Sequence, residues 1–161
     1  MYLLLLAVGH VFSYLLLYFL FPVFFRSGVP TIGWRSLRSV AYIVVAYLSV
    51  LFVSFAASDP EWSNRILHIF GGGFVSLSVC FLVVSDTHLR ISRFQFIVFS
   101  ILVVTGLGVA NEITEFFLQN YLGFVFAEGV NDTWLDLISN VCGALIATLC
   151  LTPLLTSGTK S

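Results

Sequence analysis

Five long apolar stretches run through this chain of 161 residues, and they constrain its fold more than any other feature. A helix needs about 20 apolar residues to cross the hydrocarbon core of a bilayer. Each of the five stretches reaches that length, and connectors containing glycine, proline or aspartate separate them. The predicted spanning helices lie near residues 2–25, 37–57, 66–85, 94–119 and 134–155.

The composition is that of a chain whose surface faces lipid. Charged residues make up 9% of the chain, whereas soluble domains carry roughly 25%. Trp34, Trp62 and Trp134 fall at the edges of apolar stretches, where amphipathic rings lie at headgroup level. We therefore predict an all-α, polytopic integral membrane bundle of about five transmembrane helices, forming a single domain over residues 1–161. A net charge of −1 without a basic run indicates no nucleic-acid partner.

The three cysteines are Cys80, Cys142 and Cys150, and all lie within apolar stretches. Their number and spacing fit neither a disulfide framework nor a CxxC metal site. We interpret them as small apolar packing residues.

The basic residues predict an orientation. With five spans, only Arg65 falls on the side opposite the other six basic residues, and the side richer in Lys and Arg is cytoplasmic. The N-terminus is then outside and the C-terminus is in the cytoplasm. The connector over 120–133 is half apolar, so we predict that it lies in the interface or dips into the membrane. The six basic residues on the cytoplasmic side are Arg26, Arg35, Arg38, Arg90, Arg93 and Lys160.

Polar residues that are costly in a membrane gather at three helix ends. An ionisable residue inside a spanning segment costs about 2.5–3.5 kcal/mol on insertion scales, so it rarely lies there without a partner. The predicted topology puts all three ends at one depth, near the outer leaflet. The candidate site residues are Arg65, His68 and Gly72 on the third helix, Asn111, Glu112 and Glu115 on the fourth, and Asp132, Asp136 and Asn140 on the fifth.

These residue types suggest distinct roles. Glu112, Glu115, His68 and Asp136 are the candidate catalytic groups, because carboxylates and imidazole exchange protons. The same four residues and Asp132 are the ligands available to a metal, although the sequence names neither a metal nor another cofactor. The candidate ligand-binding residues are Arg65, Asn111, Asp132, Asn140 and Gly72.

Each feature also has a structural interpretation. A spanning helix can use such residues for capping, for local ion pairs and for close packing. The structural alternatives are Asp136 as a cap with Thr133, Arg65 paired with Glu61 on its own helix, His68 hydrogen-bonded within the bundle, and Gly71–Gly73 as a site of close helix contact.

Three motifs resemble those of the VanZ-like membrane proteins and their uncharacterised inner-membrane relatives. They are Asn64-Arg65-Ile66-Leu67-His68 with Gly72, then Glu112-Ile113-Thr114-Glu115, then D-T-x-x-D-L-x-x-N-x-x-G from Asp132 to Gly143. The resemblance covers roughly residues 60 to 150. VanZ-like proteins often have Asp-Lys where this chain has Asn64-Arg65, and Gln where it has Glu115. The resemblance implies a prokaryotic cytoplasmic membrane, with membrane lipids and a lipid-linked or lipidated envelope compound as partners.

The sequence leaves several functions open. The outer-leaflet cluster is expected to bind or process a lipid headgroup or lipid-linked compound. The alternative is a non-catalytic structural or assembly subunit, in which the cluster holds the last three helices together. Proton or ion transport is weaker, because the ionisable residues gather in one leaflet. The chain contains neither a G-x-S-x-G nor an H-E-x-x-H motif.

Overall fold

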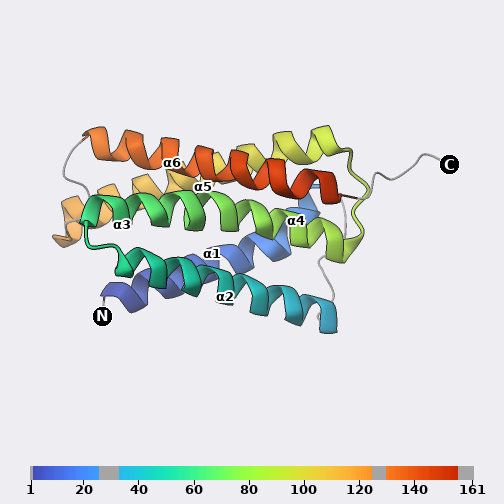
Figure 1. Ribbon diagram of the computed structural model, residues 1–161, viewed down its shortest axis with the longest axis horizontal. Helices are drawn as coiled ribbons and strands as arrows, with labels where there is room; N and C mark the ends of the chain where they lie inside the picture. The colour runs from blue at the N-terminus through green and yellow to red at the C-terminus, as the bar shows by residue number, and fades with distance from the viewer. Residues whose placement is uncertain (1, 26–32, 125–129, 156–161) are drawn as a thin grey trace.

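The computed structural model describes residues 2–25, 33–124 and 130–155, and the side chains from residue 7 onward. Figure 1 shows the helices running along the long axis of one bundle, with the beginning of α1 and the end of α6 at opposite ends. The elements are α1 (Tyr2–Phe24), α2 (Trp34–Ala56), α3 (Pro60–Ile66), the π-helix η1 (Leu67–Val75), α4 (Ser76–Thr87), α5 (Arg93–Leu122), α6 (Val130–Leu151) and the 3-10 turn η2 (Thr152–Leu154).

The predicted all-α membrane bundle is confirmed. The described residues contain helices and no strand, and five helical segments are long and apolar enough to cross a membrane. The third of these is the continuous rod of α3, η1 and α4, over Pro60–Thr87. The bundle in Figure 1 therefore has one spanning segment for each predicted apolar stretch.

Three spans begin at least three residues earlier than the sequence predicted, at Trp34, Pro60 and Val130. The third span begins at Pro60 because the Asp59 carboxylate caps it, accepting from the backbone N–H of Glu61 at 2.8 Å and of Trp62 at 3.3 Å. Proline suits the first helical position, where its missing N–H is not needed. The last span begins at Val130, so Asp132 lies in its first turn rather than in the connector.

The rod of α3, η1 and α4 is not α-helical throughout. Leu67–Val75 forms a π-helix, whereas the sequence predicted a plain α-helix there. π-helical turns are rare and frequently occur at functional sites. The four residues expected to share one face all line the same cavity. They are Arg65, His68, Gly72 and Ser76.

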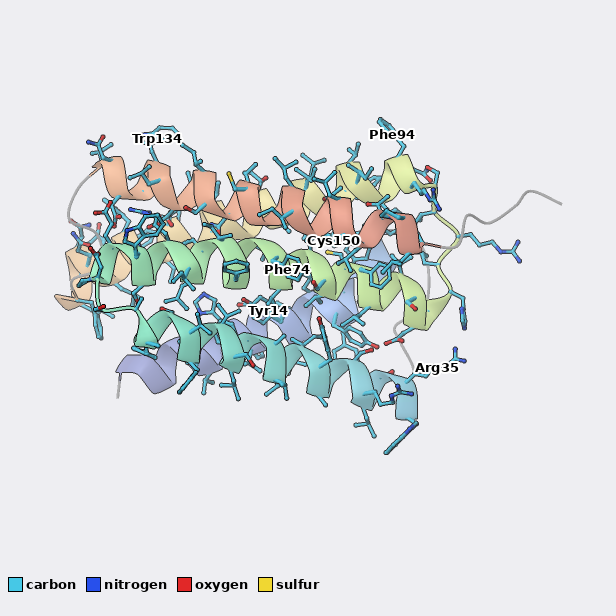
Figure 2. The ribbon with its side chains drawn as sticks, in the orientation of Figure 1. Tyr14, Arg35, Phe74, Phe94, Trp134 and Cys150 are labelled. Carbon is cyan, nitrogen blue, oxygen red and sulfur yellow. The ribbon has the colours of Figure 1, made fainter. Side chains whose placement is uncertain are left out.

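Aromatic residues occupy both the interior and the outer surface of the bundle. Tyr14 and Tyr18 of α1 and Tyr47 of α2 are buried. Figure 2 shows Tyr14 inside the bundle, whereas Phe94 and Trp134 project away from it. Many large apolar side chains are exposed in the same way, as expected of helices surrounded by lipid.

The interpretation of the cysteines holds for one of the three. Cys80 is buried in the core, in agreement with a packing role. Cys142 and Cys150 are exposed on the surface of the bundle, so their interpretation as packing residues within it was wrong. The spacing of eight residues puts both on the outer face of α6, and sequence alone does not tell a lipid-facing position from a buried one when both are apolar.

The charge asymmetry behind the predicted orientation is present, although the orientation itself stays a prediction. Arg35 lies at the end of the bundle opposite Trp134 (Figure 2), and its guanidinium Nη1 lies 2.9 Å from His88 Nε2. Arg93 is at that end too, where it donates to the carbonyls of Pro153 and Leu155. Arg26 and Lys160 lie outside the described residues, as does part of the predicted interfacial connector, residues 125–129.

The Tyr14→Phe variant is expected to lower the free energy of unfolding by about 1–2 kcal/mol. The buried Tyr14 hydroxyl donates to the Gly71 carbonyl of the π-helix at 2.9 Å, and phenylalanine leaves that carbonyl without this donor. Unfolding in detergent by added SDS provides the measurement. Tyr42→Phe is the control, because Tyr42 is exposed on α2. Equal losses in both variants would contradict the assignment.

Candidate functional site

Arg65 connects the third span to the last one. Its guanidinium forms ion pairs with the carboxylates of Asp132 and Asp136. Asn64 donates to both oxygens of Asp136, at 3.0 and 3.2 Å. The structure thus pairs Arg65 with α6, and not with Glu61 of its own helix as one alternative held.

Asp136 is the most deeply buried ionisable residue of this group, with 2% of its side chain exposed. It lies in the second turn of α6, so it does not cap that helix, as the structural alternative proposed. His68 Nε2 lies 3.4 Å from Asp136 Oδ2. Asp136 is therefore the shared partner of Asn64, Arg65 and His68.

His68, Glu112 and Glu115 form a second group, which we call the His-Glu-Glu triad. One ligand atom from each residue lies within 4.8 Å of the other two, across η1 and α5. Asn111 Nδ2 donates to Glu115 Oε1 at 2.7 Å. One carboxylate oxygen of Glu112 is buried and accepts no hydrogen bond from the residues that the structure describes.

Glycines bring η1 and α6 into direct backbone contact. A Cβ on Gly73 would lie 2.3 Å from the Asn140 carbonyl oxygen, and one on Gly143 would lie 1.8 Å from the Ile69 carbonyl oxygen. At Gly72 the obstacle is a side chain, because a Cβ there would lie 1.9 Å from Asn140 Oδ1. The close-packing interpretation thus accounts for these glycines, and the Asn140 amide fills the space over Gly72.

A partly open cavity of about 1160 Å³ lies between the helices at this end of the bundle. Every spanning segment contributes to its wall. The polar part of the wall includes His68, Asn111, Glu115 and Asp132, and the apolar part includes Leu51, Phe55, Leu107 and Leu118. Glu112 and Asp136 are not among the lining residues.

The sequence-derived cluster therefore divides into two parts with different surroundings. The carboxylates of Asp132 and Asp136 have a cation in Arg65, which joins two helices. Among the described residues, no Lys or Arg forms an ion pair with Glu112 or Glu115. The triad is thus the part of the cluster with free capacity to accept a proton, a hydrogen bond or a metal ion.

A family model supports the membrane assignment. The model of a family described as predicted membrane protein, DUF2238, matches residues 4–157. The chain belongs to this family. The match does not extend to the VanZ-like family, so that closer resemblance stays a proposal. Separate searches among curated proteins and among solved structures found no match.

In this DUF2238 protein a second polar cluster lies at the other end of the bundle, and sequence reasoning missed it. Asp86 accepts from the hydroxyls of Tyr18 and Ser39, both at 2.6 Å. Asp86 and His88 line a hollow of about 550 Å³ with Arg35. The sequence suggested only a turn at Asp86, because its partners are 68 and 47 residues away and follow no spacing rule.

Proposed function

We propose that this membrane protein binds the polar headgroup of a lipid, or of a lipid-linked envelope compound, in the cavity between its helices. The cavity itself is the observation that carries the proposal, because its wall combines polar side chains such as His68 and Glu115 with apolar ones such as Leu51 and Leu118. Ligand sites are typically concave and apolar, with a few convergent polar groups. An amphipathic molecule matches both parts of this wall.

The predicted orientation places the cavity at the outer leaflet. Arg35, Arg38, Arg90 and Arg93 belong to the opposite end, which the excess of basic residues makes cytoplasmic. The resemblance to VanZ-like proteins agrees with a prokaryotic cytoplasmic membrane. The ligand would then enter from the outer leaflet, where headgroups of envelope precursors are exposed.

Processing of the headgroup is the enzymatic form of the same proposal. His68 and Glu115 line the cavity, and a carboxylate oxygen of Glu112 lies within 4.8 Å of a ligand atom of each. Carboxylates and imidazole are the usual general bases, so these groups are suited to take a proton from a bound hydroxyl or water. Binding alone requires less of the site, and it is the function that we propose.

A structural role is the second candidate, and one observation favours it for part of the cluster. The ion pairs of Arg65 with Asp132 and Asp136 hold α3 against α6. These three residues thus serve the fold, whereas Glu112 and Glu115 form no ion pair with Lys or Arg among the described residues. The two candidate functions therefore apply to different residues of one layer.

Leu51→Trp is expected to reduce co-purifying lipid by about tenfold or more, which corresponds to about 1.4 kcal/mol. Leu51 lines the cavity from α2, so an indole ring at this position occupies space that the ligand needs. Native mass spectrometry of the detergent-purified protein measures the fraction of chains that carry a lipid.

Leu48→Trp is the matched control, because Leu48 lies three residues away on the exposed surface of the same helix. This variant is expected to retain the lipid of the wild type. Equal lipid occupancy in the two tryptophan variants, with both folded, would refute a ligand site in the cavity. The structural role would then be the leading function.

A further inference from the structure

We propose that the His-Glu-Glu triad binds a divalent transition-metal ion at the wall of the cavity. Sequence reasoning offered five possible metal ligands, and the structure reduces them to His68, Glu112 and Glu115. The inference rests on the proposed function and deepens it, because a bound cation gives an acidic wall affinity for the phosphate of a headgroup.

The geometry of the triad is close to that of a metal site. Its three ligand atoms lie within 4.8 Å of one another. Zinc binds imidazole nitrogen and carboxylate oxygen at about 2.0–2.2 Å, so the donors of a tetrahedral site lie about 3.4 Å apart. Small rotations of the two flexible glutamate side chains would bring the ligand atoms from within 4.8 Å to about 3.4 Å of one another. A nitrogen and two oxygens are a donor set that divalent zinc, manganese and iron accept.

The charge of the triad also favours a positive partner. Two carboxylates lie at membrane depth, where an uncompensated charge is costly. Arg65 already pairs with Asp132 and Asp136. No described residue donates to the buried Oε1 of Glu112, and this is the independent sign of a missing ligand, because a buried polar atom normally has a partner.

Neighbouring side chains are placed to orient the triad. Asp136 Oδ2 lies 3.4 Å from His68 Nε2, and Asn111 donates to Glu115 Oε1. Outer partners of this kind fix the rotamer of metal-binding residues. Three protein ligands leave a fourth position open, as in catalytic zinc sites. His68 and Glu115 line the cavity, so the open position faces it.

Zinc content of the purified protein tests the inference. The full chain is loaded with Zn²⁺ in detergent, passed through a desalting column and analysed by elemental mass spectrometry. The wild type is expected to retain about one zinc per chain. Glu112→Gln and Glu115→Gln are each expected to retain at least tenfold less, because the amide is a poor metal ligand. Bound Zn²⁺ is also expected to raise the Tm of the wild type and not that of these variants.

Glu61→Gln is the matched control. Glu61 lines the same cavity but does not belong to the triad, so this variant is expected to keep its zinc. A wild type without stoichiometric zinc, or zinc retained in both folded triad variants, would overturn the metal site. In that case the two glutamates hold a proton instead.

Lipid occupancy, measured on the same samples, separates this inference from the proposed function. Removal of zinc by a chelator is expected to lower the bound phospholipid by about tenfold. If the wild type retains lipid but no zinc after loading, the metal site is refuted. The headgroup proposal is then still supported. Zinc bound without any lipid would support the metal site and count against the headgroup proposal. Lipid that is unaffected by the chelator would refute the link between the metal and the phosphate.

Discussion

Gly143→Ala is expected to lower the free energy of unfolding by about 3 kcal/mol or more, near the upper limit for overpacking. A Cβ at this position would lie 1.8 Å from the carbonyl oxygen of Ile69 and 3.1 Å from the Cα of Gly73. Both obstacles are backbone atoms of η1, so no side-chain rotation relieves the clash. The two helices must separate, and the contacts between them are then lost.

Gly106→Ala provides the control for Gly143→Ala. Gly106 lies within α5, and a Cβ there would meet nothing within 4 Å. Alanine is a better helix former by up to about 1 kcal/mol, so the Gly106 variant is expected to be as stable as the wild type or slightly more stable. Titration with SDS, followed by circular dichroism, measures both. Equal stability of the two alanine variants would show that α6 does not approach η1 as closely as the structure has it.

The number of spans, and the gathering of the polar residues at one end of the bundle, were predictable from the sequence. A run of about 20 apolar residues is sufficient to specify a spanning helix, because the bilayer satisfies no backbone hydrogen bond. Once five spans are set, chain direction alone places the beginning of the third and fifth helices at the same end as the close of the fourth. The proximity of His68, Glu112 and Asp136 thus followed from topology.

The partners within that layer were not predictable. Arg65 has acidic neighbours in its own helix and in α6, and only the relative rotation of the two helices decides between Glu61 and Asp136. That rotation depends on how closely Gly73 and Gly143 let the backbones approach. The π-helical turn also influences this relative rotation of the two helices. No periodic pattern in an apolar sequence predicts such a turn.

The division of the cluster explains why one layer of residues supports both a structural and a functional interpretation. Arg65 and Asp136 form an ion pair with each other, and removal of either side chain should affect the fold. Glu112 and Glu115 lack a basic partner among the described residues, and their removal should affect a ligand. Variants of Arg65 and Asp136 should therefore lose stability, whereas variants of Glu112 and Glu115 should lose a bound ligand. Stability measurements on the Arg65 group give the sharper test of this division.

Arg65→Met is expected to cost about 3–5 kcal/mol of folding free energy. Its guanidinium is the cation for Asp132 and for Asp136, and 2% of the Asp136 side chain is exposed. Loss of the arginine leaves a carboxylate buried without its charge partner. Asp136→Asn is expected to cost less, about 1–2 kcal/mol, because Arg65 keeps Asp132 and the amide oxygen still accepts from Asn64.

The double variant Arg65→Met/Asp136→Asn decides whether the pair acts as a unit. We expect it to be more stable than the sum of the single effects predicts, by about 2 kcal/mol, because the second change removes the charge that the first one strands. Glu61→Gln is expected to stay within about 0.5 kcal/mol of the wild type, since the structure pairs Arg65 with α6. Additive losses in the double variant, or a large loss of stability in Glu61→Gln, would indicate that the Arg65 guanidinium pairs with Glu61 of its own helix. The cluster would then no longer divide into a helix-joining part and a ligand-facing part.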